Sequence, residues 1–277
     1  LCMFAFIFVC ACVSPARTRA AEEERPCIGV KIGGISFWGA QWIFVDAFKH
    51  SMPWRSQQKE KSLNLDERGW VRSLKEGQTA WTVMFLGQTE YPAGDYVCLY
   101  EGRGELSFGG DASVVGSAPG RVVVRVEPAG DGIKVVLDST TPEDYLHNIR
   151  LIMPGHVDTY EAQPFHPRFL RLLKGFDLIQ FNGLLKPSNT KVEHTWPTRV
   201  TPDHQTQGGS RGMAVEYAVS LCEETGSDAW FVMPVNADAD YFCSFAEFVK
   251  KKLRAPAKVY VEYGYDVGVW PTFSLRT

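Results

Sequence analysis

The chain has 277 residues, of which 45% are hydrophobic and 22% are charged, and its formal net charge is −3. This composition is typical of a globular protein with one large domain or two of moderate size. The slightly acidic balance, with Lys and Arg scattered along the chain, argues against nucleic acid or an anionic membrane as the partner.

The chain begins with an apolar run, LCMFAFIFVCACV, which is too short to cross a bilayer comfortably. Small residues follow this run at Ala16, Ala20 and Ala21. This order predicts a secretory signal peptide over residues 1–21, and therefore a secreted protein with no membrane association after cleavage. A membrane-anchored N-terminus is the alternative, because no positively charged leader precedes the apolar run.

Four cysteines follow the leader, at Cys27, Cys98, Cys222 and Cys243, and their spacing contains no C-x-x-C pattern. This spacing argues against a zinc site, and we expect no bound metal and no cofactor. Export would permit a disulfide between Cys222 and Cys243. Buried free thiols are the alternative.

The first zone of the chain, residues 27–58, opens with IGVKIGG, a strand that ends in two glycines. An aromatic-rich stretch follows, with Ile43, Phe44, Ala47 and Phe48 at the spacing of one helix face. The pattern predicts one strand–loop–helix unit.

The second zone, residues 59–155, changes to short apolar segments separated by Gly, Pro and Asp turns. Examples are TAWTVMFLG, DYVCLYEG, GELSFGG, GRVVVRVEP and GIKVVLDS. Strands that recur at this short, regular spacing are typical of an antiparallel β-sandwich.

The third zone, residues 156–277, alternates helices with apolar strands. The helical segments are PRFLRLLKG, GMAVEYAVSLCEETG, which ends at Gly226, and DADYFCSFAEFVKKKL, which Asp238 is placed to cap. The strands between and after them are FDLIQFNG, AWFVMPVN and KVYVEYG. Such alternation predicts a parallel sheet. The expected fold is α/β plus all-β: a partial (β/α)8, TIM-type barrel of about four units with the sandwich inserted after the first.

Barrels of this type handle ligands at the C-terminal ends of their strands. Aromatic, amide and guanidinium side chains cluster at these ends and in the connection EHTWPTRVTPDHQTQGG, a combination that suits a sugar. The second tryptophan of the first zone, Trp42, is either a further stacking platform or a core residue. The expected substrate-binding residues are Trp38, Asn182, Trp196, Arg199, Asn236, Tyr263 and Tyr265.

Alternation along the last strand separates its two faces. Tyr260, Glu262, Gly264 and Asp266 share one face, and the valine-rich opposite face suits packing under helices. We therefore expect Asp266 at the rim of the barrel as the catalytic candidate, with Glu262 deeper as the second choice. The alternatives are a solvated turn residue for Asp266 and a buried carboxylate paired with Lys or Arg for Glu262.

The motifs GVKIGGISFWGAQW, YPAGDYVCLYEGRGELSFGGDA, FLRLLKGFDLIQFNGLLKPSN, WPTR, WFVMPVNADADYF and KVYVEYG run through most of the chain. Together they resemble secreted bacterial and algal proteins described as glycoside-hydrolase-like or cellulose-binding-domain proteins. The resemblance implies a barrel of the retaining glycosidase clan with an inserted β-sandwich. In that family the fourth strand ends in VEYSNEVWN or a close variant.

Here the corresponding segment is VEYGYDVGVW, with Tyr265 in place of the Asn and Asp266 in place of the general acid/base Glu. Retaining hydrolysis also needs a second carboxylate, ~5–5.5 Å from the first, which the resemblance places on a seventh strand. Only four alternating strands precede Thr277, so the C-terminal half of the barrel is expected to be missing. We expect a secreted glycoside-hydrolase-like protein that acts on or binds a β-linked polysaccharide and is inactive as this fragment. A non-catalytic carbohydrate-binding or cell-surface adhesion protein is the alternative.

Overall fold

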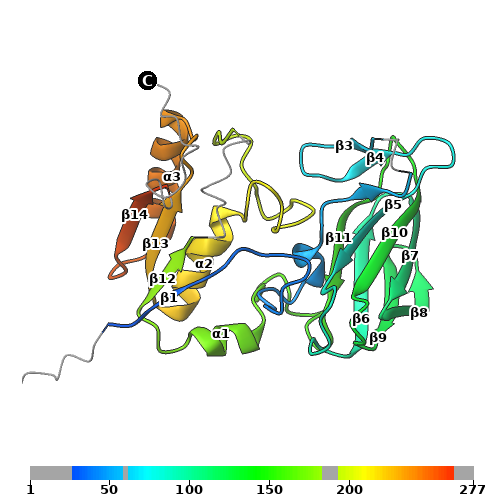
Figure 1. Cartoon of the computed structure of the whole chain (residues 1–277), viewed down its shortest axis with the longest axis horizontal. Helices are drawn as coiled ribbons and strands as arrows, with labels where there is room; N and C mark the ends of the chain where they lie inside the picture. Colours follow the sequence, from blue (N-terminus) through cyan, green and yellow to red (C-terminus); the bar gives the residue numbers. More distant parts are fainter. Residues whose placement is uncertain (1–26, 59–61, 183–192, 265–277) are drawn as a thin grey trace, which may run out of the picture.

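The computed structural model describes residues 27–58, 62–182 and 193–264. Two units lie side by side, an all-β unit and an α/β unit, and the N-terminal segment crosses from the second to the first (Figure 1). Within the described residues, no helix combines the length and the apolar content that a membrane span needs.

The all-β unit consists of two four-stranded antiparallel sheets and a small hairpin. The first sheet has the order β2 (Arg55–Ser56), β5 (Ala80–Met84), β10 (Ile133–Thr140), β7 (Gly104–Gly110). The second has the order β11 (His147–Ile152), β6 (Gly94–Glu101), β9 (Arg121–Val126), β8 (Ala112–Ala118). The hairpin consists of β3 (Asn64–Leu65) and β4 (Val71–Ser73).

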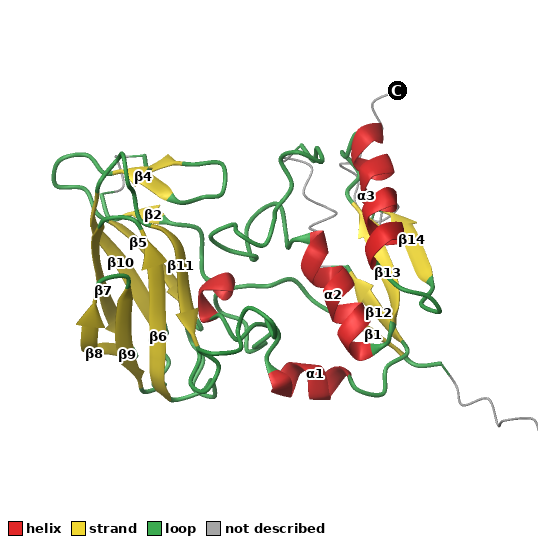
Figure 2. Ribbon diagram, turned by 180° about the vertical axis from the view of Figure 1, so that it is seen from behind, coloured by secondary structure: helices red, strands yellow, loops and turns green. Residues whose placement is uncertain are grey.

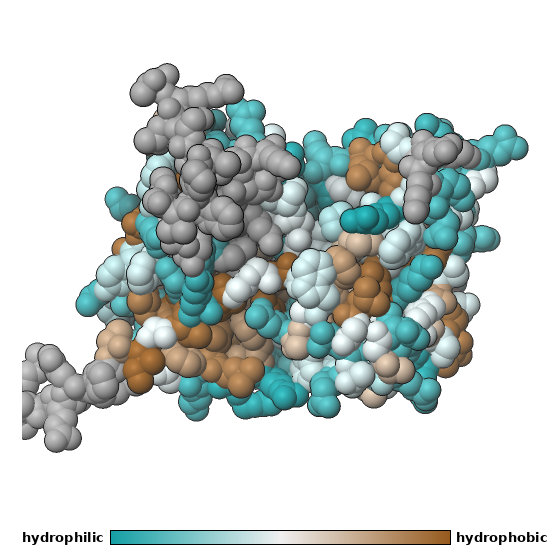
Figure 3. All heavy atoms as spheres, in the orientation of Figure 1, coloured by the Kyte–Doolittle hydropathy of each residue, from teal (hydrophilic) through white to brown (hydrophobic). Residues whose placement is uncertain are grey.

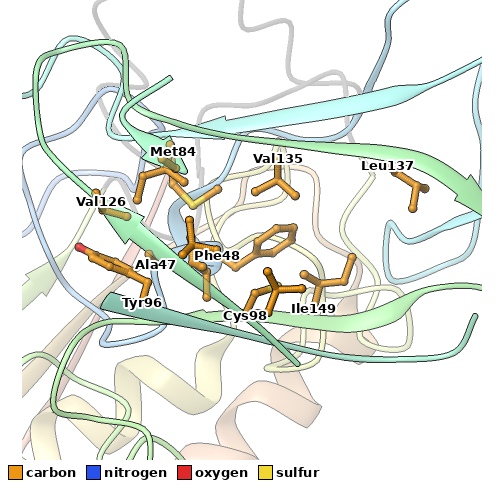
Figure 4. Packing of buried hydrophobic residues seen from close by; sticks show 14 of the residues in the cluster. Ala47, Phe48, Met84, Tyr96, Cys98, Val126, Val135, Leu137 and Ile149 are labelled. Carbon is orange, nitrogen blue, oxygen red and sulfur yellow. The ribbon is translucent and has the colours of Figure 1, made fainter. Parts of the chain in front are cut away.

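Alternating side chains build the core between these two sheets. In β9, Val122, Val124 and Val126 are buried, whereas the residues between them are less so, because successive side chains on a strand point to opposite faces. Phe48 from the N-terminal segment enters the same core and lies among Val135 and other labelled side chains in Figure 4. Residues from the first zone therefore complete the core of the all-β unit.

The helix expected around Phe44 and Phe48 is reduced to a single 3₁₀ turn, η1 (Ala47–His50). Phe44 and Asp46 are extended instead and form isolated β-bridges with Phe165 and Ile152. The helical spacing of the apolar residues predicted one buried helix face. Consecutive residues from Ile43 to Phe48 are buried instead, so the pattern did not mark a helix.

The α/β unit contains a parallel sheet of four strands in the order β1 (Gly29–Lys31), β12 (Leu178–Phe181), β13 (Asp228–Met233), β14 (Val259–Tyr263). Its helices are α1 (Pro167–Leu173), α2 (Val215–Thr225) and α3 (Ala239–Lys252). In Figure 2, α2 and α3 lie on one face of this sheet. Ile179, Phe181 and Phe231 of the sheet share a buried cluster with residues of all three helices.

Two predicted helix ends are confirmed. Gly226 terminates α2 with a φ of 70°, in the left-handed region that glycine adopts at low cost. The Asp238 side chain caps α3 by accepting a 2.7 Å hydrogen bond from the N–H of Tyr241.

The predicted TIM-type barrel is wrong. Within the described residues, the parallel strands form a four-stranded sheet without closure, and most strands belong to the antiparallel sheets. A barrel closes only when strand number, tilt and stagger agree, and four strands cannot satisfy this condition. Alternation of helices and strands specifies parallel pairing, but it does not specify closure. The expectation that the C-terminal half of the barrel is missing depended on the barrel and has no basis in the open sheet.

Candidate functional site

A cleft of about 460 Å³ lies where the α/β unit meets the all-β unit. It is bounded by β1, by α1, by the segment before η1 and by the loop after β5, and we refer to it as the β1–α1 cleft. Hydrophobic residues gather on this face of the molecule around α1 and β1 (Figure 3). Its apolar lining includes Ile32, Phe169 and Leu173, and its polar lining includes Lys31, Gln41, Gln88, Glu90 and Arg168.

Trp42 and Arg168 form one wall of the cleft. The guanidinium carbon of Arg168 lies 4.6 Å from the centre of the indole ring of Trp42, which is a cation–π contact. The ring of His166 meets the same indole edge-on at 5.6 Å, and its Nδ1 accepts a 3.2 Å hydrogen bond from the N–H of Arg168 at the start of α1. Burial lowers the pKa of His166 to about 4, and the neighbouring His156 and the two arginines of α1 add to this effect. The ring therefore stays neutral and serves as an N-cap near pH 7.

The opposite wall comes from the loop that follows β5. The side-chain amide of Gln88 donates a 2.7 Å hydrogen bond to the main-chain oxygen of Trp38, and Leu86 N–H donates at 2.9 Å to the oxygen of Phe37. Phe85, at the base of this loop, has a φ of 59° although its ring is fully buried. Bulky residues rarely adopt this left-handed conformation, and such strain concentrates at functional sites.

The lining of the β1–α1 cleft suits a neutral ligand rich in hydroxyl groups. Two amides, one carboxylate, one ammonium and one guanidinium group surround an apolar floor and an indole. Glu90 is the single carboxylate among the lining residues, and the described part of the chain contains no group of three or more His, Cys, Asp or Glu that could hold a metal. The cleft therefore offers hydrogen-bond donors and acceptors beside an apolar surface.

Trp38 adjoins the lining of this cleft through its main-chain oxygen, which accepts the hydrogen bond from Gln88. The residue is 58% exposed, as a stacking platform requires. Trp42 lines the cleft and also packs against the core cluster of the all-β unit, so both interpretations of this residue stay open.

Trp196 and Arg199 contact each other, away from the β1–α1 cleft lining. The guanidinium carbon of Arg199 lies 4.2 Å from the Trp196 ring centre and the Arg199 Nη2 lies 2.5 Å from Glu216 Oε1. The Trp196 ring also packs against Tyr241 and Phe248 of α3. These contacts leave less of the Trp196 ring free for stacking, and the sugar-binding role of Trp196 stays a prediction.

Asn182, Asn236 and Tyr263 lie at or just beyond the C-terminal ends of three adjacent strands, as parallel pairing requires. Asn182 is buried, whereas Tyr263 is 55% exposed and its hydroxyl donates a 2.9 Å hydrogen bond to the oxygen of Val235. None of the three lines the β1–α1 cleft.

Glu262 lies on the sheet face that α2 and α3 leave uncovered. Its Oε2 accepts hydrogen bonds from the Gln180 amide at 3.3 Å and from the Trp230 indole at 3.1 Å. An amide and an indole thus hold this carboxylate, in place of the Lys or Arg considered for it. Tyr265 and Asp266, and with them the predicted acid/base position, lie outside the described residues, as does the predicted signal peptide at residues 1–21.

Sequence reasoning missed Gln41, Gln88, Glu90 and Arg168. These residues come from three segments far apart in the chain, and none forms a motif with its neighbours. Cys222 and Cys243 are free thiols, so the disulfide considered between them is not formed; Cys222 is buried, as the alternative expected, whereas Cys243 is exposed.

No family model, no curated protein and no solved structure matches this chain. The resemblance to secreted glycoside-hydrolase-like proteins therefore stays a prediction. The proposed function rests on the residues that line the β1–α1 cleft.

Proposed function

We propose that this is a secreted carbohydrate-binding protein that holds a segment of a β-linked polysaccharide in the β1–α1 cleft without hydrolysing it. The observation that carries the proposal is the bond from Gln88 to the main-chain oxygen of Trp38, which ties the backbone of this exposed tryptophan to a cleft that contains a second indole. The apolar leader in the sequence supports export.

Indole rings and side-chain amides would contact different parts of a sugar. An exposed ring such as Trp38 offers a flat apolar surface for the C–H face of a pyranose, while Gln41, Gln88 and Glu90 offer donors and acceptors for its hydroxyl groups. Because Gln88 is held by Trp38 and Trp42 is held by Arg168, little side-chain freedom is lost on binding.

Hydrolysis has weaker support at this cleft. A retaining or inverting glycosidase uses two carboxylates on opposite sides of the bond it cleaves. Glu90 is the one carboxylate that lines the cleft in the described part of the chain. Binding without turnover is therefore the function that the lining favours.

The test is sedimentation with insoluble β-glucans, followed by calorimetric titration with the matching soluble oligosaccharides. We expect Trp38→Ala to weaken binding about fivefold or more, since stacking on an aromatic ring contributes about 1–3 kcal/mol where it has been measured on nucleic acid bases. Trp81→Ala is the matched control, because Trp81 is a half-buried tryptophan on β5 that contacts Lys134 and does not line the cleft.

Three outcomes would contradict the proposal. Equal binding by the wild type and Trp38→Ala would exclude the stacking role, and no binding by the wild type to any glucan would exclude sugar binding. Turnover of aryl β-glycosides by the purified protein would overturn the non-catalytic part of the proposal.

A further inference from the structure

A second cavity, of about 320 Å³, lies between the turn of the β3–β4 hairpin and the connection that follows Trp196. We refer to it as the arginine pocket. Three guanidinium groups line it, from Arg68 on the hairpin and from Arg199 and Arg211 on the connection, together with Thr198, Thr201 and His204. Glu67 is its one acidic lining residue within the described part of the chain.

Two of the three arginines are fixed in place. Arg199 is only 19% exposed and is held by the ring of Trp196 and the carboxylate of Glu216. Arg68 Nη1 lies 2.8 Å from Asp203 Oδ2, and this contact leaves the other N–H groups of its guanidinium fork without a partner in the described structure.

The two walls of the arginine pocket are also tied to each other. The main-chain oxygen of Arg68 accepts a 2.9 Å hydrogen bond from Gln205 N–H, and the Trp70 indole donates at 3.3 Å to the oxygen of Asp203. The pocket is consequently formed before any ligand arrives, which lowers the entropic cost of binding.

Arg211 is the arginine of the pocket whose positive charge has no carboxylate partner among the described residues. Its side chain is exposed, and it makes no ion pair and no side-chain hydrogen bond with the residues that the structure describes. Burial lowers the pKa of His204, Asp203 opposes this shift, and Arg211, Lys49 and Arg68 add to it. Arg68 and Arg199 each face a carboxylate, so Arg211 is the guanidinium group of the lining that stays unpaired among the described residues.

His204 adds a neutral donor to this site. Its Nδ1 accepts a 3.0 Å hydrogen bond from Thr201 N–H, so that the proton of the neutral ring resides on Nε2. A pocket with one imidazole N–H and several guanidinium N–H groups offers donors in excess of acceptors, which is the requirement for binding an oxyanion.

We propose that the arginine pocket binds a tetrahedral oxyanion, a sulfate or phosphate group, through Arg68 and Arg211, while Arg199, held by Glu216, forms a fixed part of the wall. Three guanidinium groups around one cavity match an anion that presents oxygen atoms in several directions, whereas a carboxylate presents only two. The volume exceeds that of a bare ion, so the group is expected to belong to an ester whose carrier occupies the remaining space. This inference is independent of sugar binding in the β1–α1 cleft.

The test titrates sodium sulfate, sodium phosphate and sodium acetate in turn into the full chain at constant ionic strength, with NMR of the backbone amides as the readout. We expect saturable binding of sulfate or phosphate, with a dissociation constant on the order of millimolar, and shifts centred on Arg68 and residues 197–211. The relative affinities for sulfate and phosphate identify which ester the pocket prefers. Acetate is expected to bind more weakly than both.

Arg211→Gln is expected to weaken sulfate binding about tenfold, because one charge-assisted contact is lost and no protein contact is broken. Glu67→Gln is expected to strengthen it, since a repelling charge is removed. Arg121→Gln, which removes an exposed arginine of β9, is the matched control and is expected to leave the affinity unchanged. Absence of saturation in the wild type, equal affinity in Arg211→Gln, or acetate binding as tight as sulfate would overturn the proposal.

Discussion

The phenol of Tyr91 donates a 2.6 Å hydrogen bond to the carboxylate of Asp111, which joins a residue of the β1–α1 cleft to the interior of the all-β unit. The same carboxylate accepts N–H groups from Gly130 and Gly132 at 3.1 Å and from Asp131 at 3.2 Å. Burial opposes ionisation of Asp111, but the hydrogen bonds from Tyr91 and the backbone outweigh it and hold its pKa below the usual value. This carboxylate therefore fixes the loop that forms one wall of the cleft.

Asp111→Ala is expected to lower the free energy of unfolding by roughly 3 kcal/mol or more, because several donors lose their acceptor at once. Urea denaturation at pH 7 measures the change. Asp138→Ala, at an exposed carboxylate on β10, is the control and is expected to stay within about 0.5 kcal/mol of the wild type. Equal destabilisation by the two substitutions would contradict the role given to Asp111.

Substitution of two glycines that have similar φ angles can distinguish the cost of a left-handed backbone from the cost of steric overlap. Gly110 has a φ of 68° and Gly77 a φ of 64°. A Cβ at Gly110 would overlap the main-chain oxygen of Gly132, whereas a Cβ at Gly77 would meet nothing within 4 Å. We expect Gly77→Ala to cost about 1–2 kcal/mol from the left-handed conformation alone. Gly110→Ala is expected to cost clearly more, and thermal unfolding that ranks the two variants the other way would contradict the turn geometry.

The pH dependence of stability is expected to reflect His50. Burial lowers its pKa to about 3, and its Nε2 accepts a 3.1 Å hydrogen bond from the N–H of Ile43. The unfolded chain takes up this proton near pH 6.5, while the folded chain does not until about pH 3. In this window the unfolded state binds more protons, so His50 reduces stability as the pH falls, by about 1.4 kcal/mol per pH unit.

His50→Gln keeps an acceptor for Ile43 N–H and removes the titration. Urea denaturation from pH 8 to pH 4 is expected to give parallel pH dependences for the wild type and His50→Gln above pH 7. Below pH 6 the wild type should lose stability more steeply. Curves that remain parallel over the whole range would show that His50 is protonated in the folded state.

Asp46 joins the N-terminal segment to β11 through one oxygen atom. Its Oδ1 accepts hydrogen bonds from Phe48 N–H at 3.0 Å and Leu151 N–H at 2.9 Å, and burial raises its pKa although Lys49 and these bonds oppose the shift. Asp46→Ala is expected to cost about 2–3 kcal/mol in urea denaturation, because two buried donors lose their acceptor. Asp46→Asn retains that oxygen and should cost less. An Asn variant as unstable as the Ala variant would mean that the charge facing Lys49 outweighs the hydrogen bonds.

Local rules were sufficient for much of the secondary structure. Gly226 and Asp238 marked helix ends because a left-handed cap and a side-chain N-cap depend on a single residue each. The alternation in KVYVEYG predicted the strand Val259–Tyr263, and the structure places Glu262 on the face away from the helices. Such features are encoded within a few consecutive residues.

Features that depend on contacts between distant segments could not be predicted from the sequence alone. The same period of alternation fits an open sheet and a closed barrel, so the prediction of a barrel had no local test. Gln41, Gln88 and Arg168 converge only because the two units pack against each other. The contacts of Trp196 with Arg199 and α3 could not be predicted, because they follow from tertiary packing rather than from the immediate sequence around Trp196.

The most direct test of the carbohydrate-binding proposal is to locate a bound β-linked oligosaccharide by NMR of the indole and side-chain amide groups. Titration is expected to shift the indole N–H signals of Trp38 and Trp42 and the side-chain amide signals of Gln41 and Gln88, while the Trp196 signal stays unchanged. Shifts confined to Trp196, Tyr263 and the neighbouring strand ends would place the sugar elsewhere and contradict the proposed site.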